Sequence, residues 1–535
     1  MERARKPYAT AKSASVLTAL STLGPLAGLA VEMALAWRFG ASATVDAFRI
    51  ATLVSFFGQQ LFIIQILPNI IVPVFTEYRI QEKEEEAWQV AFSLANLLLI
   101  PTTLISLLLF IWPGPVVHLL GPGLVGEARV TATFFVCWFA LTFIPLVWTG
   151  VAAGILYAQG IFWLPPASQL LSNVVLVIMI LAFGRRLGPA SLVVGTVLAS
   201  VGNWILYMTR FAPLMRRAGV WIPFSINVGH AGVRKALRLA LPLLGAVMMA
   251  QWSAIVINRV LSQLPTGILA TFGYAWKMGQ LISLLPAALV TILFPRFAES
   301  WYSSRDGEFR KVCINALRMA LFIVLPLTCI FFALRVPVVT LLFQRGEFSV
   351  ETRETAARLF GLFLLGAPAS AVCVYLQRIL YAVQEMWIPT CIQLTSVLCL
   401  TVIAPVMAAS FGVDGVALVA AVVLPWLTSG GLLLILSQRY RAIRIQELGV
   451  FAVEILPLAV AAAWFGGEGG KALGQLIGSS ILSLGLTIVG GTSLAILTFY
   501  GTTLLLRFPE ALQSQGYLQW QRAIVVRRMQ NVLCG

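Results

Sequence analysis

Long apolar stretches alternate with short polar loops along almost the whole chain of 535 residues. A helix needs about 20 mainly apolar residues to cross the ~30 Å hydrocarbon core of a bilayer. About fourteen stretches reach that length: residues 14–38, 46–76, 87–112, 129–158, 161–183, 189–209, 233–262, 267–297, 309–333, 354–383, 386–410, 414–436, 447–465 and 477–506. The pattern predicts an all-α polytopic membrane protein with about 14 transmembrane helices.

The apolar pattern repeats within the chain. The segment Ile155–Ala158, followed by Trp163 and Pro165, recurs as Ile379–Ala382, followed by Trp387 and Pro389. A second motif, Pro73–Glu77, recurs as Pro295–Glu299 with Pro, Phe and Glu at matching positions. The copies of each motif end helices that are six predicted spans apart, so both copies have the same orientation in the membrane. Internal repeats are typical of secondary transporters.

We therefore predict two parallel six-helix repeats that form two lobes, plus two extra C-terminal helices. The N-terminal lobe covers residues 1–217 and the C-terminal lobe covers residues 218–438. Residues 439–535 hold the two additional transmembrane helices and a cytoplasmic tail. Prolines inside the predicted spans are expected to kink them: Pro68, Pro101, Pro145, Pro286 and Pro326.

Composition agrees with a location in the membrane. Hydrophobic residues make up 59% of the chain and charged residues 11%, whereas soluble domains carry about 25% charged residues. The net charge of +16 comes from basic residues in short loops, which favours contact with membrane lipids over nucleic-acid binding. Most basic loops fall on one side of the predicted topology together with both ends of the chain. Both termini are therefore expected in the cytoplasm.

Motifs for catalysis or cofactor binding are absent from the sequence. The seven cysteines form no CxxC pair, and the two histidines, His118 and His230, lie in different loops. The glycine-rich stretch Gly466–Lys471 continues with Ala472 instead of the Ser or Thr of a phosphate-binding loop. We therefore expect no metal, no cofactor and no enzymatic activity.

Ionisable residues inside the apolar stretches are the candidate functional residues, because charges at bilayer depth are costly and face protein or water. The basic candidates for substrate binding are Lys277, Arg259, Arg49 and Arg38, and the acidic candidates for coupling or gating are Glu32 and Asp46. Lys277 lies about 15 Å along a helix from the preceding turn, near the middle of the core. The excess of basic groups favours an anionic ligand, since Arg and Lys are good phosphate partners.

These residues also have purely structural interpretations. An ion pair between Lys277 and Glu32 or Asp46 would serve only to hold helices together. Arg38 and Arg49 lie near the outer ends of the first two spans, where long basic side chains reach the lipid headgroups.

Several segments resemble the MviN/MurJ-type lipid II flippases, within the multidrug/oligosaccharidyl-lipid/polysaccharide exporter superfamily. They are Phe39–Ala43 with Asp46–Phe48, Tyr274–Lys277, Leu341–Phe348, and Tyr381-Ala382 with Pro389. The resemblance implies a central cavity between two lobes and alternating access. It matches Asp46 to a functional acidic position and Lys277 to a cavity arginine that binds diphosphate. Gln59 and Gln60 stand where the family has two arginines, and this places Gln59 among the substrate-binding candidates.

The sequence thus predicts a flippase for a polyprenyl-diphosphate-linked saccharide in the bacterial cytoplasmic membrane. A precursor of peptidoglycan and a precursor of another surface polysaccharide both fit. Coupling to Na⁺ or H⁺ and drive by the membrane potential are both left open. The first alternative is a cation-coupled exporter of drugs or small amphiphiles. A membrane scaffold or a glycan polymerase is the second, and the short outer loops argue against a polymerase.

Overall fold

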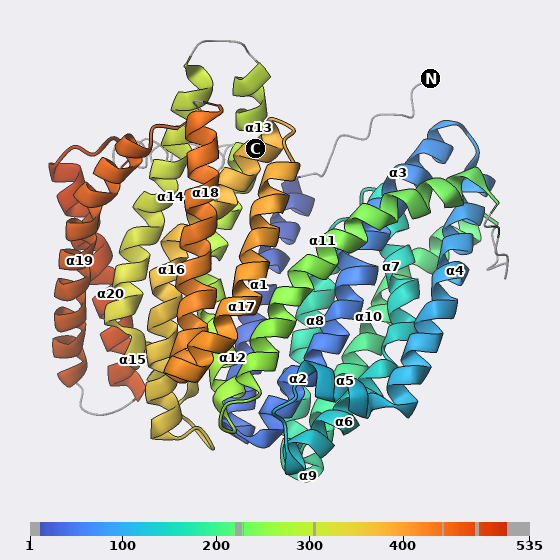
Figure 1. Ribbon diagram of the computed structural model, residues 1–535, viewed down its shortest axis with the longest axis horizontal. Coiled ribbons are helices and arrows are strands. Elements are labelled where there is room, and N and C mark those ends of the chain that lie inside the picture. Colours follow the sequence, from blue (N-terminus) through green and yellow to red (C-terminus); the bar gives the residue numbers. More distant parts are fainter. Residues whose placement is uncertain are drawn as a thin grey trace, which may run out of the picture. The chain divides into compact units, whose positions relative to one another are not determined.

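The computed structural model describes residues 11–219, 227, 229–302, 307–440, 443–476 and 481–510, and within these ranges the chain is helical without strands (Figure 1). Ten of the described helices are long and apolar enough to cross a membrane, or up to twelve if each of two bent pairs forms one span. The predicted class, an all-α polytopic membrane protein, is therefore confirmed. The basic residues at both chain ends, such as Arg3 and Arg528, lie outside the described residues.

Contacts within the chain group it into two compact units. Unit 1 comprises Met1–Tyr274, Arg345–Thr352 and Leu400–Val416, and unit 2 comprises Ala275–Gln344, Arg353–Cys399 and Ala417–Gly535. The predicted lobes, residues 1–217 and 218–438 with an extension at 439–535, remain a prediction.

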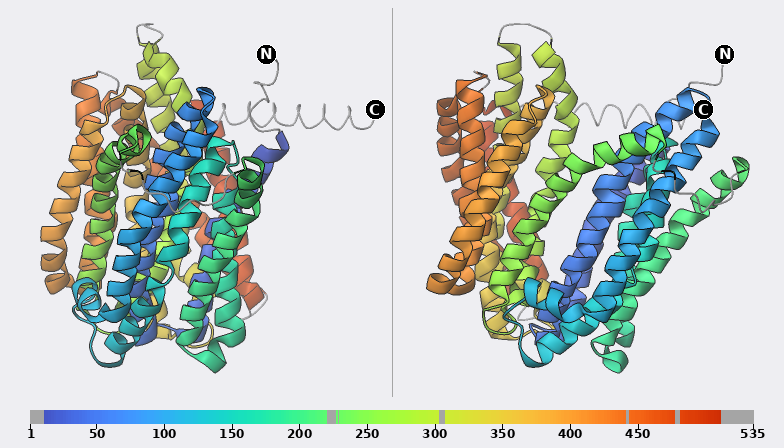
Figure 2. Two further views of the ribbon diagram at one scale, coloured as in Figure 1. Left: turned by 90° about the vertical axis from the view of Figure 1, so that its right-hand side faces the viewer. Right: turned by 45° about the vertical axis from the view of Figure 1, so that its right-hand side comes forward.

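Unit 1 holds the first eleven α-helices and two π-helices. They are α1 (Ala11–Phe39), α2 (Ala43–Gln59), η1 (Gln60–Gln65), α3 (Ile66–Ile80), α4 (Glu84–Ile111), α5 (Pro113–Leu120), α6 (Gly126–Ala140), α7 (Phe143–Ala158), α8 (Leu164–Ile178), η2 (Met179–Phe183), α9 (Gly184–Leu187), α10 (Ala190–Arg217) and α11 (Ala231–Leu261). Helix α2 packs against α6, α1 against α8, and α3 against α7. Figure 2 shows the blue and teal helices of this unit running side by side.

Helix α12 (Ile268–Ile282) begins in unit 1 and ends in unit 2. The other helices of unit 2 are α13 (Leu284–Tyr302), α14 (Glu308–Ala333), α15 (Arg335–Phe343), α16 (Val350–Ala382), α17 (Trp387–Ala417), η3 (Leu418–Val423), α18 (Leu424–Gln438), α19 (Ile445–Gln475) and α20 (Ile481–Leu505). The first residues of α16, up to Thr352, and the second half of α17, Leu400–Val416, belong to unit 1. The core of unit 2 forms where α14, α16, α18 and α19 bring together fully buried side chains such as Leu317, Tyr375, Leu436 and Ile455.

Proline positions explain where two predicted spans break. Pro145 has no N–H to bond the carbonyl of Leu141, and Pro286 has none for Ile282. Accordingly α6 ends at Ala140 before α7, and α12 ends at Ile282 before α13. The resulting bends are 45° and 41°. By contrast, α4 and α14 continue through Pro101 and Pro326.

The predicted count of fourteen spans stays a prediction. One difference lies in the helical run Trp387–Gln438, 52 residues long, which covers two predicted spans. Gly412 interrupts it with a backbone φ of 59°. A second difference lies in α11, of which only Val247–Leu261 forms an apolar helix, shorter than the other spans.

The sequence repeat has a structural counterpart at the ends of α7 and α16. Ile161 N–H bonds the Leu156 carbonyl at 2.9 Å, and Glu385 N–H bonds the Leu380 carbonyl at 2.9 Å. In each case the preceding residue, Gly160 or Gln384, has a positive φ. Both helices therefore end in the same left-handed capping turn, and this turn falls at matching positions of the repeated motif.

Small residues bring the last two helices together. A side chain at Gly470 of α19 would fall on the backbone carbonyl of Thr487 of α20, and Gly466 lies equally close to Gly491. Such stripes allow close packing of membrane helices. This close packing of α19 on α20 accounts for the glycine-rich stretch Gly466–Lys471.

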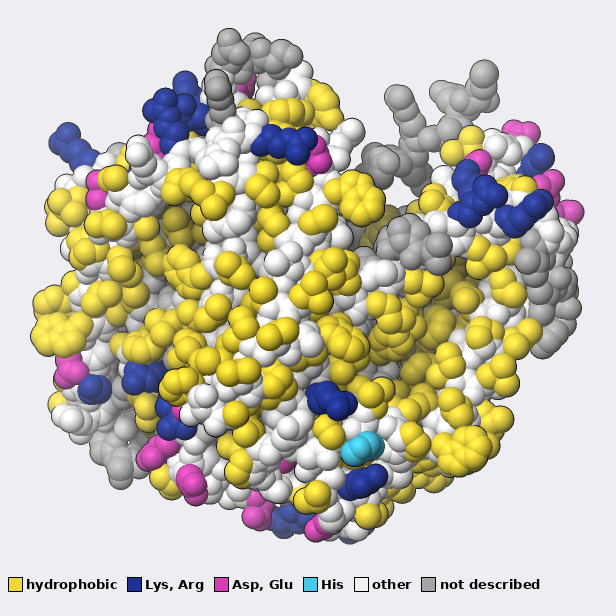
Figure 3. Space-filling model, in the orientation of Figure 1, with side chains coloured by type: hydrophobic (Ala, Val, Ile, Leu, Met, Phe, Trp, Pro, Cys, Tyr) yellow, Lys and Arg dark blue, Asp and Glu magenta, His cyan; other side chains and the backbone are white. Residues whose placement is uncertain are grey.

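Hydrophobic side chains cover most of the face drawn in Figure 3, and charged side chains gather near its upper and lower edges.

Candidate functional site

The turn between α1 and α2 lies against the N-terminal end of α12 within unit 1. Gly267, with a φ of 89°, precedes the first residue of α12 and approaches the Ala41 carbonyl so closely that a side chain would not fit. The positive φ and the close approach both require glycine at this position. This packing brings the first turn of α2 to the N-terminal backbone amides of α12, which have no partner within that helix.

Asp46 binds those amides. Its Oδ2 accepts from Gly267 N–H at 2.6 Å and its Oδ1 accepts from Ala270 N–H at 2.7 Å. The side chain is buried. The first N–H groups of a helix have no partner within the helix and carry partial positive charge. Asp46 therefore caps α12 from a different helix, a role that its position on α2 alone does not indicate.

Glu32 of α1 and Arg49 of α2 form a two-pronged ion pair. Arg49 Nη1 donates to Glu32 Oε1 at 2.9 Å, and Nη2 pairs with Oε2. The Arg49 and Glu32 side chains are only 17% and 10% exposed. The planar guanidinium matches both carboxylate oxygens. Within the described residues, Arg49 Nε is buried without a hydrogen-bond acceptor, so one donor of this cation is unused.

The Arg49 guanidinium also contacts α12. A side chain at Gly273 would come within 2.5 Å of the guanidinium carbon, and the guanidinium lies 5.4 Å from the Tyr274 ring centre. Tyr274 in turn donates its hydroxyl to the Gly40 carbonyl at 2.6 Å and packs edge-on against Phe348. We refer to Glu32, Asp46, Arg49, Gly273 and Tyr274 as the α2–α12 cluster.

Lys277 lies on α12 one helical turn after Tyr274 and is partly exposed. It has no ion pair within its own unit, over the part of that unit that the structure describes. The two carboxylates considered as its partners are engaged in unit 1, Glu32 by Arg49 and Asp46 by backbone amides. The placement of Lys277 near the middle of the bilayer remains a prediction.

Three other candidates lie outside the α2–α12 cluster. Arg259 on α11 is exposed and donates to the Leu119 carbonyl at the end of α5. Arg38, at the end of α1, lies over the Phe39 ring with its Cζ 5.7 Å from the ring centre. Gln59 ends α2 with an exposed side chain, immediately before η1. Their substrate-binding roles stay predictions.

The sequence missed Gly273 and Tyr274 as partners of Arg49. Neither is ionisable, and a search for charges inside apolar stretches does not find them. A usable signal is the pair Gly273-Tyr274, one helical turn before Lys277. The glycine leaves space beside α12 for a guanidinium, and the aromatic ring offers a face for that guanidinium to stack against.

Comparison with known proteins places these residues in a wider context. The family model described as "Lipid II flippase MurJ" matches residues 35–470. A probable lipid II flippase MurJ of Rickettsia prowazekii is 23% identical over 391 residues, covering 72% of this chain and 76% of the relative. One from Aquifex aeolicus is 25% identical over 380 residues, with 70% and 73% covered.

Solved structures show a similar fold. A lipid II flippase MurJ in an inward closed conformation superposes with a TM-score of 0.77 and 17% identity, covering 92% of this chain and all of that one. An inward-facing multidrug resistance transporter of the MATE family and the MOP superfamily gives 0.63 and 15%, covering 80% and 98%. At these identities the likeness concerns the fold alone.

Proposed function

Because the chain belongs to the lipid II flippase MurJ family, we propose that it moves a polyprenyl-diphosphate-linked saccharide across the bacterial cytoplasmic membrane. It acts as a multi-pass transporter and not as an enzyme. The relatives from R. prowazekii and A. aeolicus are both named probable lipid II flippases. Lipid II, a peptidoglycan precursor, is therefore the first cargo to test.

The observation that carries the proposal is Lys277 on α12, a partly exposed cation without an ion pair in the described part of its own unit. A cation in surroundings of low dielectric constant suits the diphosphate of a lipid-linked saccharide. The polyprenyl tail would stay in the lipid.

The α2–α12 cluster is proposed as a latch for alternating access. Asp46 and Tyr274 tie the α1–α2 turn to the first turns of α12 through three hydrogen bonds. Closing one side of a transporter requires contacts of this kind, which break when that side opens. Both acidic candidates are engaged in the latch, and this supports gating over ion binding for Glu32 and Asp46.

The driving force follows from that assignment. With Glu32 and Asp46 committed to protein partners, we propose that the membrane potential, at ~2.3 kcal/mol per charge per 100 mV, drives expulsion of the anionic headgroup. Neither Na⁺ nor H⁺ is then required as a coupling ion. Dissipating the potential with valinomycin and K⁺ should stop transport, whereas replacing Na⁺ by choline should not.

Translocation assays in proteoliposomes test the binding role of Lys277. A labelled polyprenyl-diphosphate saccharide is placed in the membrane, and its appearance on the opposite face is followed with an enzyme that acts only there. Lys277→Ala should reduce the rate by about tenfold or more, because one charge-assisted contact contributes ~1.5–3 kcal/mol. Lys277→Arg should retain most of it. Lys311→Ala, at an exposed lysine of α14, is the matched control.

Unchanged transport by Lys277→Ala would refute the binding role. The choice of saccharide is tested in the same assay, with lipid II against other polyprenyl-linked glycans. Gln59 and Gln60 stand where the family has two arginines, and this difference is the reason to compare several saccharides. Transport of cationic dyes in place of every lipid-linked saccharide would support the alternative of a cation-coupled exporter.

A further inference from the structure

Helix α19 is covered by unit 2 on one face only. It packs against α14 and α20 (Figure 1), and its other face is open among the described residues. Five exposed apolar residues on the open face are three or four positions apart in turn: Val450, Val453, Pro457, Val460 and Trp464. This spacing forms one apolar seam along a helix, of the kind against which a second helix packs.

Ion pairs mark the two ends of the apolar part of α19. At the first end, Glu447 pairs with Arg310 of α14 at 2.8 Å and with Arg444 at 3.2 Å. At the second end, Glu468 pairs with Lys471 at 2.8 Å. At ~1.5 Å per residue, the stretch from Glu447 to Glu468 is about 32 Å long, which matches a hydrocarbon core of ~30 Å. The residues between the two pairs therefore lie at the depth of the hydrocarbon.

Glu454 interrupts this apolar stretch. It lies about 10 Å beyond Glu447 along the helix, and its side chain is exposed beside Val453 of the seam. Among the described residues, its carboxyl group forms no ion pair and no hydrogen bond. A charge at bilayer depth is costly unless it faces water or a partner. The carboxyl group of Glu454 thus has a use for a partner that the described part of the chain does not supply.

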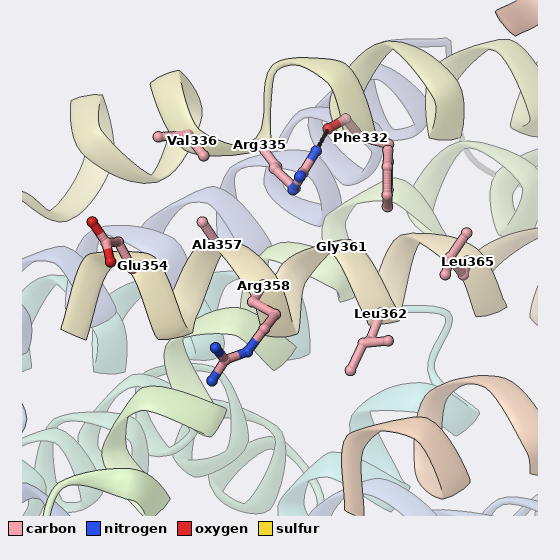
Figure 4. Close-up of a pocket in the computed structure, with 9 residues that line it drawn as sticks. All are labelled: Phe332, Arg335, Val336, Glu354, Ala357, Arg358, Gly361, Leu362 and Leu365. Carbon is pink, nitrogen blue, oxygen red and sulfur yellow. Dashed lines mark hydrogen bonds between the residues drawn. The ribbon is translucent and has the colours of Figure 1, made fainter. Parts of the chain in front are cut away.

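Two other charged side chains of unit 2 show the contrast. Arg335 borders a cavity lined mainly by apolar side chains and donates an N–H to the Phe332 carbonyl at 2.7 Å (Figure 4). Arg318 of α14 pairs with Glu510 at 2.8 Å. Both cations are engaged within their own unit, whereas the Glu454 carboxyl group is exposed and unpaired among the described residues.

We propose that the open face of α19 docks a spanning helix of another membrane protein, one that carries a lysine or arginine at the depth of Glu454. The seam provides apolar packing, and the carboxylate provides the charge complementarity that selects the partner. A second copy of this chain would bring its own Glu454 to the same depth, and like charges repel. Cationic lipid headgroups stay outside the hydrocarbon, about 10 Å from Glu454. This docking is independent of the cargo.

Energy transfer in proteoliposomes tests the proposal. The full-length protein carries a fluorescent donor at its C-terminus, and the probes are designed apolar helices of ~20 residues that carry an acceptor. The probes differ at one position, about 10 Å inside the core, which holds Lys, Leu or Glu. The Lys helix should bind about tenfold more tightly than the Leu helix, because one charge-assisted contact forms. The Glu helix should bind no better than the Leu helix.

Variants of Glu454 separate this contact from general packing. Glu454→Leu should bind the Lys helix only as tightly as the Leu helix, and Glu454→Lys should prefer the Glu helix. Glu468→Gln, at an exposed glutamate near the other end of α19, is the matched control and should behave as the wild type. The unfolding temperature of Glu454→Leu should be no lower than that of the wild type, which excludes loss of fold as the cause.

Equal binding of the Lys and Leu helices by the wild type would overturn the proposal, and so would a preference for Lys that persists in Glu454→Leu. Donor-labelled and acceptor-labelled copies of the chain are also mixed in the absence of a probe. Association of these copies that Glu454→Leu abolishes would assign the face to a second copy, and this result also contradicts the proposal.

Discussion

At the scale of single residues, the buried Glu32–Arg49 pair permits a quantitative test. Removing one partner leaves the other charge unpaired away from water, which costs ~3–5 kcal/mol in buried pairs. Glu32→Gln should therefore lower stability by about that amount, judged from thermal unfolding in detergent. The double variant Glu32→Gln/Arg49→Gln should lose less than the sum of the single variants. Strict additivity would mean that the pair does not act as a unit.

Asp46 offers a second test at this scale, because its two oxygens serve two amides. Asn retains one acceptor oxygen and loses the charge that favours a helix N-terminus, so Asp46→Asn should destabilise the start of α12 by ~1–2 kcal/mol. Amide hydrogen exchange at Gly267 and Ala270 should then accelerate. Glu127→Gln, in the first turn of α6, should leave those amides unchanged. Equal exchange in wild type and Asp46→Asn would contradict the cap.

The sequence identified the charged residues of the α2–α12 cluster but not their partners. A rule based on the cost of charge in lipid finds Glu32, Asp46 and Arg49 because they interrupt apolar stretches. The same rule left Lys277 as an ion-pair partner for either Glu32 or Asp46. The actual choice depends on Gly267 and Gly273, whose missing side chains let α12 approach the α1–α2 turn and the guanidinium. Such packing between helices far apart in the chain is not encoded in local periodicity.

At the scale of elements, the repeated caps of α7 and α16 differ in one residue that matters. Gly160 and Gln384 occupy the same left-handed position, which disfavours any residue with a side chain by ~1 kcal/mol. Among the residues that the structure describes, none lies within 4 Å of the position that a Cβ at Gly160 would take. Gly160→Gln should thus lower stability and Gln384→Gly should raise it, each by ~1 kcal/mol or less in unfolding assays.

The opposite signs make this pair informative. The two substitutions exchange the same residue types in opposite directions, so a general effect of glycine on the unfolded chain has opposite signs in them. Gly430→Gln, at a helical glycine of α18 with open space beside it among the described residues, measures that effect for the Gly→Gln direction. If Gln384→Gly destabilised the protein, the glutamine side chain would be making contacts that outweigh the strained φ.

At the scale of the whole molecule, apolar length predicted the helices well because hydrocarbon thickness fixes how many residues a span needs. It predicted their breaks less well. Pro145 and Pro286 end helices, whereas Pro101 and Pro326 lie within continuous ones, and the difference depends on whether neighbours satisfy the freed carbonyl. The π-helix η1 before Pro68 is a similar local adjustment that hydropathy does not reveal.

The number of crossings is decided at Gly412. A single crossing by the 52 residues of Trp387–Gln438 would extend ~78 Å, more than twice the ~30 Å core. The φ of 59° at Gly412 turns the chain there, so the run should cross twice. Reporter domains fused after Gly412 and after Gln438 should therefore report opposite sides of the membrane. By the predicted orientation Gln438 is cytoplasmic, because Arg439 and Arg444 follow it. Reporters on the same side would remove one crossing and place the two termini on opposite sides.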